Sequence, residues 1–160
     1  MDITLKPFRA TGHPKPVASF KVTEKSWKIF TYHSQLSDFY ELAKNLEKKE
    51  KIQAQTMLMQ LGQRCESGQP LENMYDSKKL HDSCIFQFII ANTQKEDKIY
   101  RIRQGNLRLY FIYYSPRKEI ILLTILIKKE KKLPKSVEVH LKNLASSIYD
   151  PSNKINAILA

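Results

Sequence analysis

The chain has 160 residues and a mass of 18.7 kDa, which is the size of one domain. Its apolar fraction of 42% and charged fraction of 27% are typical of a globular protein and exclude a disordered or fibrous one. A chain of this length buries about two-thirds of its unfolded surface, so its core needs neither disulfides nor a metal ion. No apolar run approaches the roughly 20 residues that cross a bilayer, so we expect no membrane partner.

Positive charge is concentrated in one part of the chain. The formal net charge is +11, and residues 98–135 contribute +9 of it, with eleven Lys and Arg against two Glu. A solvated surface normally mixes charges of both signs, so this enrichment indicates a polyanionic partner, nucleic acid above all. The alternative interpretation is a basic surface that neutralises an acidic protein.

The positions of the cysteines indicate the cellular compartment of the protein and whether it has a metal site. Cys65 and Cys84 lie far apart and outside any CxxC pattern. We interpret them as reduced thiols of a cytoplasmic protein, with a disulfide as the alternative. The first sixteen residues contain no continuous apolar segment, so we expect no secretory signal. No motif predicts a zinc site, and we expect no metal and no other cofactor.

The N-terminal half combines an extension, a strand and two helices. Residues 1–26 are rich in proline and are expected to form an extension. Alternating residues predict a strand at 27–32. An apolar stripe from Leu36 to Leu46 predicts one helix, and a second is expected over about residues 50–65. This helical hairpin has a single apolar side, which requires a sheet to pack against.

The C-terminal half predicts most of the sheet. A strand is expected at 85–91, followed by a polar turn at 92–97. Residues 99–103 and 107–114 alternate between apolar and polar side chains, and the turn residues 104–106 join them into a hairpin.

This alternation assigns side chains to faces of the sheet. It places Arg101 and Arg103 together on one face of the first hairpin strand, and Arg108 and Tyr110 together on one face of the second. The nearly continuous apolar run at 119–127 predicts a central strand.

The last predicted element is a helix. Pro134 suits its first turn, and its apolar stripe ends before Asp150. The domain prediction is therefore an extension (1–26), a main domain (27–149) and a tail (150–160). For the main domain we expect an α+β fold. An N-terminal strand and a helical hairpin would pack on a mostly antiparallel sheet of about four strands, followed by a C-terminal helix.

Two segments of the C-terminal half resemble the RelE/ParE toxin superfamily of bacterial toxin–antitoxin systems. They are YRIRQGNLRLYF (100–111) and IILLTILIKKEKKLPKSVEV (120–139). In that family a YRIR-type strand, a glycine-containing turn and an arginine-bearing strand precede an apolar strand that ends in basic residues. The basic end is similar to the phage-derived HigB-like branch and its K-K-x-x-K-x-P pattern, on which Lys128, Lys129, Lys132 and Pro134 fall. With the preceding helical hairpin, the resemblance covers about residues 27–149.

The resemblance implies a RelE-like fold and the toxin of a type II toxin–antitoxin system. Such toxins are endoribonucleases that cleave messenger RNA on the ribosome without a metal ion. The 2′-hydroxyl attacks the adjacent phosphodiester, so one group must take its proton, cations must stabilise the phosphorane and an acid must protonate the leaving oxygen. The implied partners are messenger RNA, the ribosome and a cognate antitoxin of the helix-turn-helix type.

The resemblance also implies roles for individual residues. Arg108 is the expected phosphate clamp, because the rigid guanidinium fork can hold two phosphate oxygens. Lys129 occupies the basic position at the end of the last strand, and Tyr110 would stack on a base or donate a proton. These three are the expected catalytic residues. The expected RNA-binding residues are Arg101, Arg103, Lys128, Lys131 and Lys132.

Several of these residues have structural interpretations as well. Arg101 and Arg103 can be ordinary exposed strand residues, Arg108 can pin the sheet through a salt bridge, and Tyr110 can be a core aromatic. His81 is a further candidate for proton transfer, with an incidental surface position as its alternative.

The chain also departs from the family pattern. It carries the N-terminal extension, an inserted segment at 81–97, and Leu107 where an aromatic residue usually precedes the arginine. These departures leave two other functions open. One is a non-catalytic protein of the same fold that binds RNA or a protein, and the other is a ParE-like toxin directed at DNA gyrase.

Overall fold

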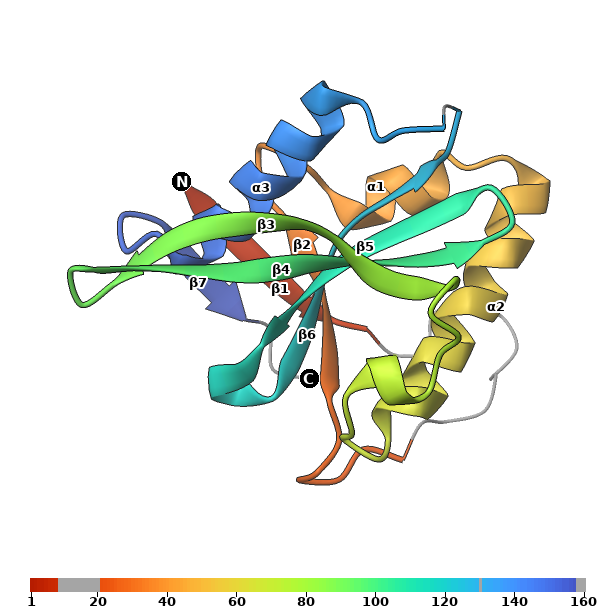
Figure 1. The fold of residues 1–160 in the computed structure, drawn as a ribbon, viewed down its shortest axis with the longest axis horizontal. Helices are drawn as coiled ribbons and strands as arrows, with labels where there is room; N and C mark the ends of the chain where they lie inside the picture. The colour runs from red at the N-terminus through yellow and green to blue at the C-terminus, as the bar shows by residue number, and fades with distance from the viewer. Residues whose placement is uncertain (9–20, 130, 158–160) are drawn as a thin grey trace.

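The computed structural model describes residues 1–8, 21–129 and 131–157. In this part of the chain, seven strands form one mixed sheet in the order β3-β4-β5-β6-β2-β1-β7 (Figure 1). Their bounds are β1 (Asp2–Pro7), β2 (Lys28–His33), β3 (Leu80–Ile90), β4 (Thr93–Gln104), β5 (Leu107–Tyr114), β6 (Glu119–Ile127) and β7 (Lys154–Ala157). Neighbouring strands are antiparallel except for two parallel pairs, β2 with β6 and β1 with β7.

The prediction of a RelE-like fold with a mostly antiparallel sheet of about four strands is therefore wrong. Segments near both ends of the chain add strands, because β1 pairs with β2 on one side and with β7 on the other. Ile3 and Leu5 of β1 are fully buried, although two apolar residues beside a proline make a weak strand pattern in the sequence. Residues 9–20 of the predicted extension and 158–160 of the predicted tail lie outside the described residues.

A long hairpin of β3 and β4 extends from the edge of the sheet (Figure 1). The turn predicted at residues 92–97 is wrong, because β4 already begins at Thr93. The actual turn consists of Ala91 and Asn92, whose φ angles are 50° and 62°. A two-residue turn with two positive φ angles matches the twist of the adjoining strands. Of the polar residues that indicated a longer turn, those at 93–96 are exposed in β4 and Asp97 is partly buried there.

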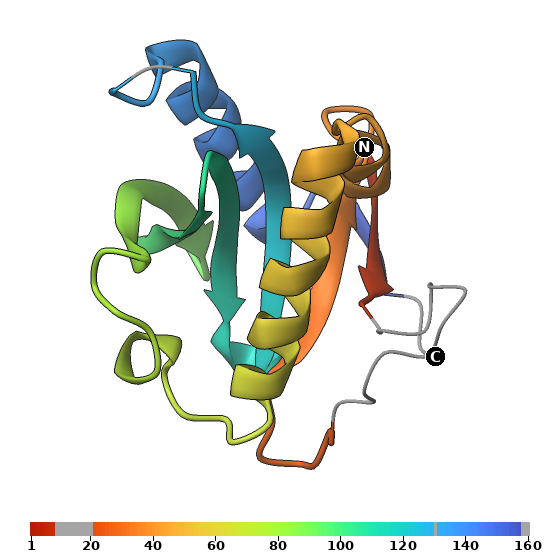
Figure 2. The same cartoon turned by 90° about the vertical axis from the view of Figure 1, so that its right-hand side faces the viewer.

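Helices cover both faces of the sheet (Figure 2). The described helices are α1 (Phe39–Lys44), α2 (Lys48–Cys65) and α3 (Lys135–Tyr149), with short 3-10 turns η2 (Leu71–Asn73) and η3 (Ser115–Arg117). The first two helices pack on one face and α3 packs on the other, which we call the α3 face. Among the described helices, none combines the length and apolarity that crossing a membrane requires.

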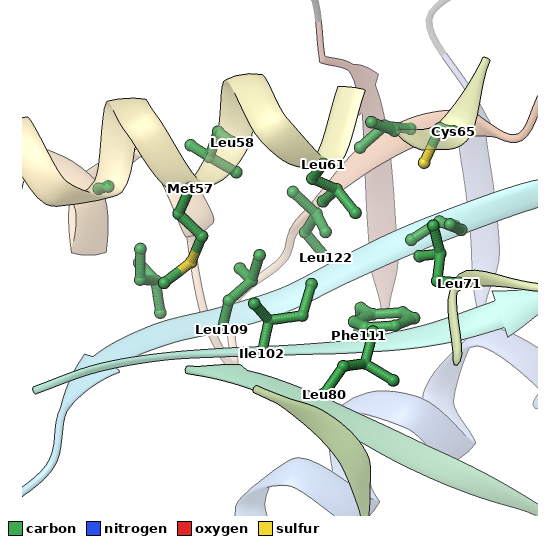
Figure 3. Packing of buried hydrophobic residues seen from close by; sticks show 14 of the residues in the cluster. Met57, Leu58, Leu61, Cys65, Leu71, Leu80, Ile102, Leu109, Phe111 and Leu122 are labelled. Atoms are coloured by element: carbon green, nitrogen blue, oxygen red, sulfur yellow. The ribbon is translucent and has the colours of Figure 1, made fainter. Parts of the chain in front are cut away.

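The alternation of β5 divides its side chains between two cores. Leu109 and Phe111 pack beneath α2 against Met57 and Leu61 (Figure 3). Ile112 lies in the other core, under α3. Fully burying one such apolar side chain stabilises the fold by about 1.5–3 kcal/mol. The predicted alternation is confirmed, and it directs every second side chain of β5 toward the α3 face.

Candidate functional site

A groove of about 800 Å³ opens between the α3 face of the sheet and the segment that leads from β6 into α3. Four strands and the first turn of α3 contribute to it, so the groove depends on the packing of distant parts of the chain. Its cationic lining residues are Lys78, Arg101, Arg103, Arg108, Lys128, Lys129, Lys131 and Lys132. Among the residues that the structure describes, no Asp or Glu lines it.

Two rows of side chains cross the floor of the groove. In one row, His81 of β3 pairs with Arg101 of β4, which pairs with Tyr110 of β5. In the other row, Arg103 of β4 pairs with Arg108 of β5. Neighbouring strands lie about 4.8 Å apart, so residues that are distant in the sequence become close neighbours here.

Arg108 is held by the backbone of the β4–β5 hairpin. Its Nη1 donates hydrogen bonds to the carbonyl oxygens of Gly105 at 2.7 Å and Leu107 at 2.8 Å. The turn places these carbonyls through Gly105, whose φ of +57° favours glycine. Arg108 is 5% exposed and makes no ion pair with a described residue. It therefore pins the hairpin through carbonyls, which leaves its cationic charge uncompensated at the groove.

Arg101 contacts the chain that enters β3. Its Nη2 donates to the carbonyl oxygen of Lys78 at 3.3 Å and to Nε2 of His81. The His81 ring also contacts the carbonyl oxygen of Asp82 through Nδ1 at 2.8 Å. The carbonyl can only accept, so Nδ1 carries the proton and Nε2 carries the lone pair. The Nε–H of Arg101 is buried and has no partner among the described residues.

The three guanidinium groups destabilise one another electrostatically. Burial lowers the pKa of Arg108, and the charges of Arg101 and Arg103 lower it further. Burial likewise lowers the pKa of Arg101, with an additional contribution from Arg103. Arginine stays protonated in proteins, so the groove keeps this charge. A bound anion would relieve the repulsion, so the groove is a candidate site for phosphate or another anion.

Tyr110 lies at the boundary between the core and the groove. It is 3% exposed and belongs to the core under α3, yet it also lines the groove. Burial raises the pKa of its hydroxyl above the ordinary value of 10.0, although Arg101 and Arg108 act in the opposite direction. Its hydroxyl makes no hydrogen bond within the described chain. At neutral pH it is therefore a protonated phenol that can donate to a ligand.

A stretch of four exposed lysines, Lys128, Lys129, Lys131 and Lys132, forms the opposite wall, and we call it the basic segment. Its first residue is fixed to the hairpin turn, because the Lys128 amide donates to the carbonyl oxygen of Asn106 at 2.7 Å. This contact brings the end of β6 beside the arginines of β4 and β5. The lysine side chains themselves remain in solvent, where they can contact a large anion.

All eight residues that were predicted for catalysis or RNA binding lie around this one groove. Their roles stay predictions, but their proximity does not depend on the assumed family. Sequence reasoning missed Lys78, which precedes β3 and reaches the groove only because β3 pairs with β4. Residues 81–97, which were predicted to be an insertion, likewise gave no sign that His81 would stand beside Arg101.

Metal ligands do not gather in the described residues. No group of three or more His, Cys, Asp or Glu within 1–8, 21–129 and 131–157 is arranged to hold a metal ion. Cys65 and Cys84 are both buried free thiols. Burial raises the pKa of Cys65 to about 12.

Comparison with known proteins adds no relative: no family model, curated protein or solved structure matches this chain.

Proposed function

We propose that the protein binds messenger RNA in this groove and cleaves it as an endoribonuclease. In this proposal it acts in the cytoplasm as the toxin of a type II toxin–antitoxin system. The observation that carries the proposal is the cluster of Arg101, Arg103 and Arg108 on one sheet face, opposite the basic segment and without a carboxylate among the described lining residues.

The chemistry of the lining fits a phosphodiester. Guanidinium groups hold phosphate oxygens through paired hydrogen bonds, and they stabilise the extra negative charge of a phosphorane. Arg103 is exposed and Arg108 is anchored, so one can adapt to the ligand while the other stays in place. The basic segment would contact successive phosphates of a strand and make binding strongly dependent on salt.

Cleavage requires proton transfer as well as charge stabilisation. When the 2′-hydroxyl attacks the adjacent phosphorus, the leaving 5′-oxygen needs a proton. Tyr110 is suited to supply it, because burial keeps its hydroxyl protonated and Arg101 and Arg108 would stabilise the phenolate that forms. Lys129 would stabilise charge from the opposite wall of the groove.

The proposed partners follow from this use of the groove. Messenger RNA would enter as a single strand on the ribosome, where its backbone is accessible. A cognate antitoxin would neutralise the toxin by covering the groove, and an acidic segment would complement its charge.

RNA binding without cleavage is the second candidate function. It is favoured by the two carbonyls that already occupy Nη1 of Arg108 and by the 3% exposure of Tyr110, which limits its access to a substrate. A protein of this kind would keep the same binding surface and the same dependence on salt.

Inducible expression in a bacterial host distinguishes the two functions. Growth is followed while the 5′ ends of messenger RNA are mapped, for the unchanged chain and for Arg103→Ala and Lys129→Ala. Both substitutions remove exposed charges from the groove, and Lys48→Ala, on the exposed start of α2, is the matched control.

Growth arrest with new 5′ ends inside translated messages is the expected result, and both groove variants should weaken it while Lys48→Ala does not. Arrest without cleavage would contradict the nuclease proposal and point to another target. Normal growth with well-expressed, folded protein would favour binding without cleavage.

A further inference from the structure

We propose that His81 is the general base of the cleavage reaction and Tyr110 its general acid, with Arg101 between them holding the scissile phosphate. This inference rests on the proposed cleavage function. It is carried by the row of cross-strand pairs in which Arg101 has His81 on one side and Tyr110 on the other.

The geometry suits an in-line displacement. The attacking and leaving oxygens lie on opposite sides of the phosphorus, so the base and the acid must approach from opposite sides. His81 and Tyr110 are separated by two strand spacings, or about 10 Å between their backbones, which leaves room for a phosphate between their side chains. Both residues line the groove, as does Arg101.

The tautomer of His81 fits the role of a base. Its Nδ1–H donates to the carbonyl oxygen of Asp82, which directs the lone pair of Nε2 toward Arg101. In this structure, Nη2 of Arg101 donates to this lone pair. A phosphate that draws the Arg101 guanidinium toward its own oxygens would free Nε2 to accept a proton from the 2′-hydroxyl.

Tyr110 fits the role of an acid. Its hydroxyl is protonated, lacks an internal partner within the described chain, and lies beside Arg101 in the β4–β5 ladder. Unlike His81, which is exposed at the rim, Tyr110 is buried and shielded from water. This difference in solvation suits a pair in which one residue, His81, acts as the base and the other, Tyr110, acts as the acid.

The proposed step balances without a further reactant. The 2′-hydroxyl gives its proton to Nε2 of His81 while its oxygen bonds to phosphorus. The bond from phosphorus to the 5′-oxygen breaks, and the 5′-oxygen takes the proton of the Tyr110 hydroxyl. The products are a 2′,3′-cyclic phosphate and a 5′-hydroxyl. Proton return from the His81 imidazolium to the Tyr110 phenolate, through water, restores the groove.

A substrate with a sulfur leaving group tests the two roles separately. A short message is prepared with either oxygen or sulfur at the 5′ bridging position of its mapped cleavage site, and its single-turnover cleavage is measured free and on ribosomes. A thiolate leaves without a proton, so the sulfur message needs no general acid. The variants are Tyr110→Phe, His81→Ala and His81→Gln, and His140→Gln on α3, outside this row, is the histidine control.

Tyr110→Phe should cleave the oxygen message about 10²–10⁴-fold more slowly and recover most of this loss on the sulfur message. Both His81 variants should be slow on both messages while RNA affinity stays within about twofold, and His140→Gln should match the unchanged chain. Urea denaturation of each variant checks that it is folded.

Three results would overturn the inference. If His81→Gln cleaves at the normal rate while His81→Ala is slow, His81 only positions Arg101 through a hydrogen bond that glutamine also accepts. If Tyr110→Phe is equally slow on both messages, Tyr110 is not the acid. If the unchanged chain cleaves neither message, the proposed function fails, and this inference fails with it.

Discussion

Arg103 and Arg108 stand directly opposite each other in the β4–β5 ladder, beside the two-residue turn that joins the strands. Like charges in directly opposite positions destabilise a sheet, and no carboxylate lines this groove in the described part of the chain. The repulsion between Arg103 and Arg108 therefore destabilises the free protein. A phosphate bound beside both guanidinium groups would turn this into a favourable interaction.

Removing one charge of this pair should stabilise the free protein and weaken RNA binding. For Arg103→Ala we expect the free energy of unfolding to rise by about 0.2–1 kcal/mol, because Arg103 is exposed and its loss relieves repulsion. Urea denaturation and RNA titration of the same sample measure both effects. Lower stability together with unchanged affinity would show that the pair has no role in anion binding.

Removing Arg108 should have the opposite effect on stability. Arg108→Ala leaves the carbonyl oxygens of Gly105 and Leu107 without this donor, and we expect it to lower the free energy of unfolding by about 1–3 kcal/mol. RNA affinity should fall as well. Arg108→Lys keeps the charge without the guanidinium fork, so it should restore little of the stability. Equal stability of all three proteins in urea would contradict the anchoring role.

The lysines of the basic segment should contribute to binding mainly through salt-dependent contacts. Replacing Lys129 or Lys131 by alanine should reduce the slope of log affinity against log salt by about 0.7 for a single strand. Fluorescence anisotropy with an oligoribonucleotide, between about 50 and 200 mM salt, gives this slope. Lys48→Ala on α2 should leave the slope unchanged. An equal decrease of the slope in all three variants would mean that binding is not confined to the groove.

A buried histidine away from the groove should make stability dependent on pH. Burial lowers the pKa of His33 below its ordinary value of 6.5, and Lys6 lowers it as well, although Asp38, which accepts from Nδ1 at 2.8 Å, raises it. The unfolded chain therefore binds the proton at a higher pH than the folded chain does. The contribution of His33 to the free energy of unfolding should be fully present above about pH 6.5. It should decrease as the pH falls from there toward the folded pKa, by at most about 1.4 kcal/mol per pH unit.

The variant His33→Gln should lose this dependence between about pH 7.5 and 5. Asp38 titrates in a lower range: partial burial acts to raise the pKa of its carboxyl, but hydrogen bonds from the Glu41 amide and His33 lower it below 3.8 overall. The contribution of Asp38 to stability is lost only as the pH falls through that lowered pKa. An identical slope in the variant and the unchanged chain would assign the dependence to other groups.

The N-terminal strand should be essential for stability. Ile3 is fully buried beneath α3, so Ile3→Ala should lower the free energy of unfolding by about 2–5 kcal/mol. Ile52 is 56% exposed on α2 and provides a matched control, for which we expect a change within about 0.5 kcal/mol. Urea denaturation measures both variants, and a similar small effect at both positions would mean that β1 contributes little to the fold.

Local patterns predicted which side chains of the candidate site lie together better than they predicted the fold. The alternation of β5 placed Arg108 and Tyr110 on one face, and the glycine turn brought β4 back beside β5. Both features depend on residues close in the sequence. The pairing of β1 with β7 joins Asp2 to Lys154, and such long-range pairing leaves no periodic signal in either short segment.

Within the site, local sequence patterns likewise could not predict the position of His81. Its place beside Arg101 depends on the register of β3 against β4, which shifts between Asp82 and Cys84. A shift of one residue moves a side chain to the other face of a sheet, and the sequence alone does not specify where it occurs. Lys78 reaches the groove for the same reason, through the chain that enters β3.

Crosslinking tests most directly whether RNA occupies the groove. A photoreactive oligoribonucleotide is bound to the full chain, irradiated and mapped by mass spectrometry. We predict crosslinks in the peptides that contain Arg101 to Tyr110 and the basic segment, and we predict their loss when unlabelled RNA competes. Crosslinks confined to the exposed lysines of α2, or equal labelling over the whole surface, would contradict the groove as the RNA site.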